Sequence, residues 1–68
     1  MKISARNVLD GVVKNVTKGS TTAHVTIDVN GAIVTASITN EAVEELALKA
    51  GGKVKAIIKS SDVMVGVA

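Results

Sequence analysis

The sequence predicts an all-β fold with one short helix, in which five strands form a small barrel. Most of the chain alternates between apolar and polar residues, as strands do, whereas one internal stretch has apolar residues at helical spacing. The chain has 68 residues, which is enough for one domain only. We therefore expect a single domain over residues 1–68.

The first predicted strand covers residues 8–18. Its residues alternate, with Val12 on one face and Val13 on the other, and both faces have some apolar character. Gly11 lies inside this strand, and an internal glycine indicates a bulge or a bend of the kind that small barrels need. Residues 18–20 (KGS) break the alternation and are predicted to form a turn.

A hairpin is predicted next. Residues 23–29 alternate cleanly, with apolar side chains at every odd position. Asn30 and Gly31 follow, and both residue types tolerate the positive φ that a type I′ turn requires. The third strand is predicted over residues 32–38, which are rich in β-branched side chains.

A helix is predicted over residues 40–50, because apolar residues recur there at helical spacing. Thr39 or Asn40 supplies the N-cap oxygen. Gly51 and Gly52 are expected to end the helix, since glycine permits a left-handed residue after the last turn.

The remaining residues predict two more strands. Residues 53–59 alternate between apolar and mostly basic side chains, residues 60–62 (SSD) form a tight turn, and residues 63–67 form a short fifth strand. The order is three strands, a helix and two strands, with a hairpin and a bent first strand. That order fits a five-stranded OB-fold-like barrel.

The composition predicts self-association. The chain is 47% hydrophobic but has no aromatic residue, so its core is built from small side chains. A core of this size contributes only about 3–5 kcal/mol, and small scaffolds usually need disulfides, a metal or partner chains. The absence of Cys and the single His exclude disulfides and a Cys/His zinc site. We therefore expect a homo-oligomer, with a functional site that can lie between chains.

Catalysis, membrane insertion and export are not expected. There is no Cys nucleophile, and no Ser and carboxylate can be assigned to the lone His24. No segment has about 18 consecutive apolar residues, and the first residues lack the apolar stretch of a signal peptide. The default expectation is a cytoplasmic protein.

Two alternative functions remain open at this stage. OB barrels often bind single-stranded nucleic acid, but they do so by stacking bases on aromatic rings, and this chain has none. Its net charge is +2, without a run of basic residues. The second alternative is a purely structural oligomerisation domain, or a regulatory sensor separated from its DNA-binding half.

A set of hydrogen-bond donors lies at the ends of the predicted elements. They comprise Ser4, Arg6, Thr39, Lys59, and Ser60 or Ser61. A tetrahedral dianion needs donors from several sides, with positive charge and no opposing acceptor, and the helix start adds backbone N–H groups. The same residues also fit an ordinary surface, on which Arg6 pairs with a carboxylate, Lys59 is solvated and Thr39 only caps the helix.

Three blocks of the chain carry a family resemblance, namely residues 4–7 (SARN), residues 38–46 with IT followed by VEEL, and residues 59–64 (KSSDVM). In these blocks the chain resembles the molbindins, the small Mop-domain proteins that bind molybdate and tungstate. The resemblance covers essentially the whole chain. It implies an OB-like barrel, hexamers built as a trimer of dimers, and a molybdate or tungstate oxyanion held at subunit interfaces for storage or buffering. It implies no organic cofactor and no metal bonded directly to side chains.

The resemblance also implies which residues bind the oxyanion. At the dimer interface these are Ser4, Ala5 through its backbone, Arg6, Thr39, Ala42, Lys59 and Ser60. Some relatives have Ser where this chain has Ala42, so only the backbone N–H can serve at that position. A second kind of site near a three-fold axis is implied, for which the candidates by position are Lys18, Gly19, Ser20 and Thr22, beside Thr21 and His24.

Overall fold

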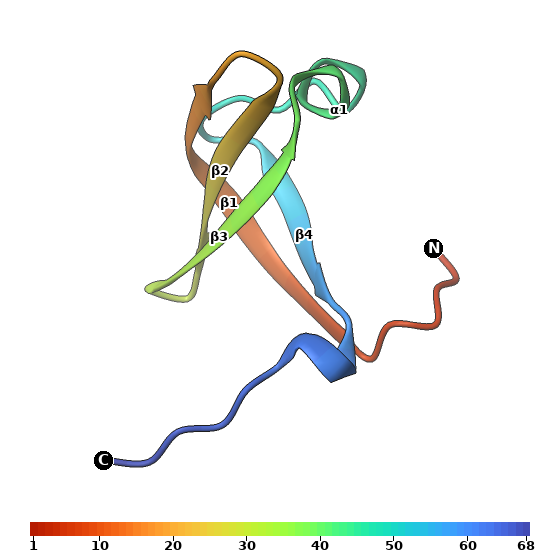
Figure 1. The fold of residues 1–68 in the computed structure, drawn as a ribbon, viewed down its shortest axis with the longest axis vertical. Helices are drawn as coiled ribbons and strands as arrows, with labels where there is room; N and C mark the ends of the chain where they lie inside the picture. The colour runs from red at the N-terminus through yellow and green to blue at the C-terminus, as the bar shows by residue number, and fades with distance from the viewer.

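The computed structural model describes residues 1–68, and its strands form one antiparallel sheet (Figure 1). The elements in chain order are β1 (Asn7–Lys18), β2 (Thr22–Val29), β3 (Ala32–Thr39), α1 (Asn40–Glu45), β4 (Lys53–Ile58) and the 3₁₀ turn η1 (Ser60–Asp62). The strand order is β3-β2-β1-β4. The mostly β fold with one short helix, and the first four predicted strands, are confirmed. The helix lies at one end of the strongly twisted sheet, and η1 lies at the other.

β1 is the strand that joins the two halves of the sheet. Its first part, from Asn7 to Val12, pairs with β4, and its second part, from Val12 to Lys18, pairs with β2. Gly11 lies where β1 crosses closely over β2, because a Cβ there would be 2.6 Å from Ile27 Cγ2. The glycine is therefore required by this close approach. The irregularity in register falls later than the bulge predicted at Gly11, between Val13 and Asn15, and a bend at Gly11 itself stays a prediction.

The β2–β3 hairpin turns at Asn30 and Gly31, as predicted. Both residues have positive φ, 50° and 91°. The Asp28 carboxylate accepts a hydrogen bond of 2.8 Å from the Gly31 N–H, which stabilises the turn. Asn-Gly is thus used for its conformational freedom.

The core is small and entirely apolar. Its buried residues are Val13, Ala23, Val25, Ile27, Val43 and Ala56. The odd positions of β2 face inward as the alternation predicts, and α1 contributes Val43 over the end of the sheet. The structure has no buried polar or charged side chain, so packing alone defines this core.

The helix is shorter than predicted, because it ends at Glu45 and not near Ala50. Ala47 takes a left-handed conformation (φ 51°), and the Leu48 N–H donates to the Val43 carbonyl while the Ala47 N–H donates to Glu44. This pair of bonds is a Schellman motif, which closes a helix. It turns Leu48 back against the core. Glycine usually occupies the left-handed position, so the sequence pointed to residues 51–52 instead.

The predicted fifth strand is not formed within the chain. Residues 63–67 follow η1 without pairing to either edge of the sheet, and Met64, Val65 and Val67 are each more than 90% exposed. The sheet therefore has four strands, and the predicted five-stranded closure was wrong for a single chain. Alternation reports an extended backbone, but it does not say which edge the strand pairs with.

Gly11→Ala should destabilise the fold by about 1–3 kcal/mol, since the new methyl group would force Ile27 or the Asp28 carbonyl to move. Urea unfolding followed by circular dichroism measures the change. Lys14→Ala, on the exposed side of the same strand, is the matched control and should change stability by less than about 0.5 kcal/mol. Equal stability of the two variants would show that β1 and β2 are not this close.

Candidate oxyanion-binding site

The pairing of β1 with β4 brings the N-terminal segment next to η1. Asn7 is opposite Ile58, and the Asn7 side-chain N–H₂ donates to the Ile58 carbonyl at 3.2 Å. The residues before Asn7 and after Ile58 therefore lie side by side. They line an open hollow of about 430 Å³. We call this hollow the cradle, and its lining residues are Ile3, Ser4, Ala5, Lys59, Ser60 and Ser61.

The cradle offers donors and positive charge without a carboxylate. Ser4 and Ser60 have hydroxyl groups, Lys59 has an ammonium group, and none of the lining residues is acidic. Arg6 is exposed and directly follows the lining segment, but it does not itself line the hollow. Among the lining residues, only Ile3 was not singled out from the sequence. Its side chain has no hydrogen-bonding group that could have indicated a place beside an anion.

Arg6 and Lys59 have no carboxylate partner. The ion pairs in the chain join Lys18 to Glu44 and Lys55 to Asp10. The alternative in which Arg6 is held by a carboxylate is therefore not observed. Both cations are free to meet an anion, which is the electrostatic condition for charge-assisted hydrogen bonding.

Thr39 and Ala42 are at the start of α1 and interact with each other. The Thr39 hydroxyl oxygen accepts a hydrogen bond from the Ala42 N–H at 3.0 Å and so caps the helix. A hydroxyl that accepts in this way still has its own hydrogen to donate. Of the two predicted ligands at this end, Thr39 thus keeps a free donor, whereas the Ala42 N–H is already engaged.

The two groups of predicted ligands lie at opposite ends of the protomer. Thr39 pairs with Thr22 at the end of the sheet where α1 lies, whereas the cradle lies beyond Asn7 and Ile58 at the other end (Figure 1). The 12 residues of β1 separate them, a strand length on the order of 30 Å or more at about 3.3 Å per residue. A single chain therefore does not bring Thr39 and Ala42 to Lys59, so the donors predicted at the ends of the elements do not form one set within one chain.

The candidates for the second site do lie together. Lys18, Gly19, Ser20 and Thr22 line one hollow with Thr17, Thr21 and His24. Lys18 is paired with Glu44, with 3.2 Å between Nζ and Oε1, and the Gly19 carbonyl accepts from the Asn40 side chain at 2.9 Å. The turn at residues 18–22 is thus bonded to α1, and Lys18 already has a carboxylate partner.

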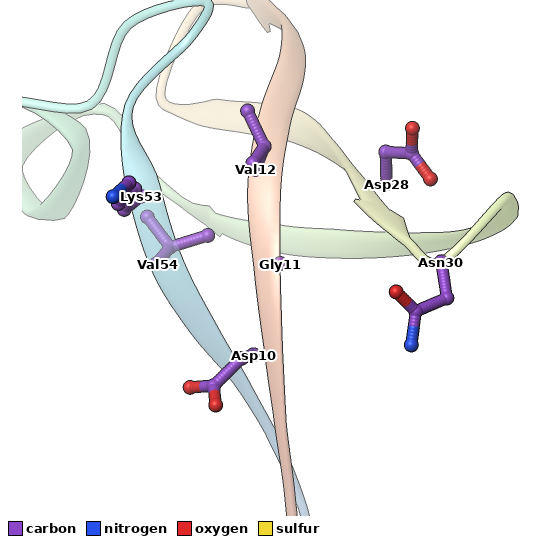
Figure 2. A pocket seen from close by; sticks show the side chains of 7 residues that line it. All are labelled: Asp10, Gly11, Val12, Asp28, Asn30, Lys53 and Val54. Atoms are coloured by element: carbon purple, nitrogen blue, oxygen red, sulfur yellow. The ribbon is translucent and has the colours of Figure 1, made fainter.

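Another hollow, of about 440 Å³, has the wrong charge for an anion. Figure 2 shows Asp28 and Asn30 on one side of Gly11, with Asp10 and Lys53 toward β4. Asp10 pairs with Lys55, and Asp28 accepts from Gly31. Two carboxylates face this hollow, so a dianion is disfavoured there and the cradle remains the candidate.

No group of three or more His, Cys, Asp or Glu side chains lies close enough to hold a metal ion. The chain also has no helix with the length and apolar character that crossing a membrane would require.

Comparison with known proteins identifies the class of protein that this fold and site define. Residues 3–65 match the family model of the TOBE domain, and the chain belongs to that family. Within it, near full-length relatives place the chain among the molbindins, which confirms the resemblance seen in the sequence.

Three of these relatives show how close the similarity is. The chain is 47% identical to a probable molybdenum-pterin-binding protein of Haemophilus influenzae, over 98% of this chain and 99% of that protein. A molybdate-binding protein from Sporomusa ovata superposes with a TM-score of 0.94 at 39% identity, over 98% of this chain and 100% of that one. ModG, described as a cytoplasmic molybdate-binding protein and solved with molybdate bound, superposes with a TM-score of 0.93 at 43% identity. The match covers all of this chain and 49% of ModG.

Thr39→Ala should cost about 1 kcal/mol of stability without any oxyanion present, since the Ala42 N–H loses its cap. Thr39→Ser is the matched control, because it keeps the accepting oxygen and should retain most of that stability. Chemical unfolding of the ligand-free protein measures both variants. If Thr39→Ser lost as much stability as Thr39→Ala, the loss of stability would come from removal of the Thr39 methyl group and not from the capping hydrogen bond.

Proposed function

We propose that this protein binds molybdate or tungstate reversibly at interfaces between copies of the chain, for intracellular storage or buffering. The observation that supports this most is the cradle, where Lys59 and three serines line a hollow without a carboxylate, and the adjoining Arg6 has no carboxylate partner. The relatives described as molybdate-binding proteins support the identity of the ligand.

The proposed mechanism is enclosure of a dianion by charge-assisted donors. Arg6 and Lys59 offset its two negative charges, and the hydroxyls of Ser4 and Ser60, with the Ala5 backbone N–H, fix its tetrahedral orientation. Because the cradle is an open hollow, these donors leave part of the anion uncovered.

A second copy supplies the uncovered side in this proposal. Thr39 of that copy donates its hydroxyl hydrogen, while its bond to the Ala42 N–H holds the oxygen in place. The role of Ala42 is thus to fix Thr39 and to add the positive end of α1. Because sulfate accepts the same hydrogen bonds, discrimination against it rests on the size of the enclosed space.

The remaining parts of the proposal concern assembly and location. We infer a homo-oligomer in the cytoplasm, a hexamer built as a trimer of dimers, in which each chain is a single Mop domain over residues 1–68.

The turn at residues 18–22 is proposed as part of a second oxyanion site nearer a three-fold axis. There Lys18 would give up its ion pair with Glu44 and bind the anion instead. Binding without turnover is proposed, and the alternative of single-stranded nucleic acid has no stacking residue to support it.

Arg6→Ala should weaken molybdate binding by about 2–5 kcal/mol, the usual cost of removing one partner of an enclosed charge pair. Isothermal titration with molybdate, tungstate and sulfate measures the change. Lys59→Ala should behave in the same way, because both cations face the same dianion. Lys14→Ala is the matched control, since Lys14 is exposed on β1 away from the cradle.

Unchanged affinity in Arg6→Ala would remove that residue from the site. A neutral effect in Lys59→Ala alone would confine the site to the N-terminal segment. If the wild-type protein bound an oligonucleotide in a salt-dependent manner and gave no heat with molybdate, the nucleic-acid alternative would replace the proposal.

A further inference from the structure

The turn between β2 and β3 contains the one Asn-Gly pair of the chain. Of the asparagines, two precede valine, one precedes glutamate, and Asn30 alone precedes a glycine. A following side chain shields the backbone nitrogen from the asparagine side chain, whereas glycine leaves that nitrogen open. Asn30 and Gly31 are both exposed, and a Cβ added at Gly31 would meet nothing within 4 Å. A backbone nitrogen can therefore attack the preceding asparagine side chain here with the least hindrance.

Such an attack is the first step of deamidation, the reaction that makes asparagine thermolabile. The Gly31 nitrogen bonds to Cγ of Asn30, the Cγ–Nδ2 bond breaks, and the Gly31 amide hydrogen leaves with the NH₂ group as ammonia. Water then opens the resulting succinimide ring at one of its two carbonyl groups. The product is either aspartate or isoaspartate, in which the main chain runs through the former side-chain carbonyl carbon. Water is the only co-reactant.

The folded turn holds the reacting atoms apart. Asn30 and Gly31 have φ values of 50° and 91°, and Val29 pairs with Ala32, which together define a two-residue type I′ turn. In this turn type, the nitrogen that follows the first central residue lies on the side of the Cα–C bond opposite to that residue's Cβ. The ring can therefore close only after the peptide between Asn30 and Gly31 rotates.

Asp28 opposes this rotation. Its Oδ1 atom accepts a hydrogen bond of 2.8 Å from the Gly31 N–H, and the residue is half-buried in β2. The bond engages the hydrogen that must leave with ammonia and fixes the nitrogen that must turn toward Asn30. Because the acceptor is ionised, this bond is stronger than one to a neutral oxygen. Asp28 is thus placed to slow the reaction.

We propose that Asn30 is a deamidation site and that Asp28 sets the rate of its reaction in the folded protein. The isoaspartyl product adds one backbone carbon to a two-residue turn and so disturbs the pairing of Val29 with Ala32. The aspartyl product adds a third carboxylate to the hollow beside Gly11, which Asn30 and Asp28 both line (Figure 2). Neither the site nor its restraint depends on oxyanion binding, so this inference holds or fails independently of the proposed function.

Peptide mass spectrometry measures the reaction after incubation in mildly alkaline buffer at body temperature, because exchange of NH₂ for OH changes the peptide mass. Asp28→Ala should deamidate at Asn30 at least about fivefold faster than the wild-type protein, the factor that loss of an ordinary hydrogen bond gives. Asp28→Asn is the matched control, since its side-chain oxygen can still accept from the Gly31 N–H. Its rate should lie between those of the wild type and Asp28→Ala.

The unfolded chain provides the reference rate. In guanidinium chloride the turn is lost, so the wild type and both variants should deamidate at one common rate, faster than the folded wild type. Asn7 and Asn15, each followed by valine, are internal controls in the same digest and should react far more slowly than Asn30. Circular dichroism in buffer verifies that each variant is folded before its rate is compared.

Several outcomes would overturn the proposal. A wild-type rate in Asp28→Ala would remove Asp28 from the restraint, and a slower rate would make it a base that assists the reaction. If Asp28→Ala did not fold, Asp28→Asn would decide, and a rate at or below that of the wild type would count against the restraint. Absence of reaction at Asn30 in the unfolded chain, or equal reaction at Asn7 or Asn15, would remove the site itself.

Discussion

The pairing of Asn7 with Ile58 is the constraint on which the candidate site depends. It sets the register between β1 and β4, and the Asn7 side chain adds a hydrogen bond to the Ile58 carbonyl. Segments more than fifty residues apart in the chain therefore enter and leave the sheet at the same point. A register shift of one residue would turn the side chains of β4 to the opposite face. The cradle exists because this one register is kept.

Charge then decides which hollow can hold an anion. The hollow beside Gly11 is similar in volume to the cradle, but two aspartates face it (Figure 2). In the cradle the only charged lining group is Lys59, and Arg6 directly precedes Asn7, which is opposite Ile58 in the β1–β4 pairing. Two of the six acidic residues, Glu44 and Asp10, pair with Lys18 and Lys55. Size alone would not have separated these two hollows.

The sequence was sufficient for local structure but not for the relations between distant segments. Alternation located β2, and Asn30-Gly31 located its turn, since both follow from the conformations that single residues prefer. The helix end was missed because Ala47 adopts a conformation that suits glycine better, and burial of Leu48 accompanies it. That is a tertiary effect, which residue preferences do not contain.

For the candidate site, too, the sequence predicted the residue types but not how distant segments are arranged. Residue types predicted donors at Ser4, Thr39 and Lys59, and the family resemblance added Ala5 and Ala42. Their separation into two ends of one protomer follows only from the topology, because it depends on β1 being long enough to hold the groups apart.

The most direct test of a site shared between two copies is complementation between two inactive variants. Arg6→Ala impairs the cradle, and Ala42→Asp places a negative charge at the helix start, where an acidic residue is compatible with the fold. Each variant alone should bind no molybdate tightly. An equal mixture, refolded together, should recover about a quarter of the wild-type stoichiometry at wild-type affinity, because random assembly joins an intact cradle to an intact helix start at one site in four. A mixture that binds no better than either variant alone would contradict a site made from two chains.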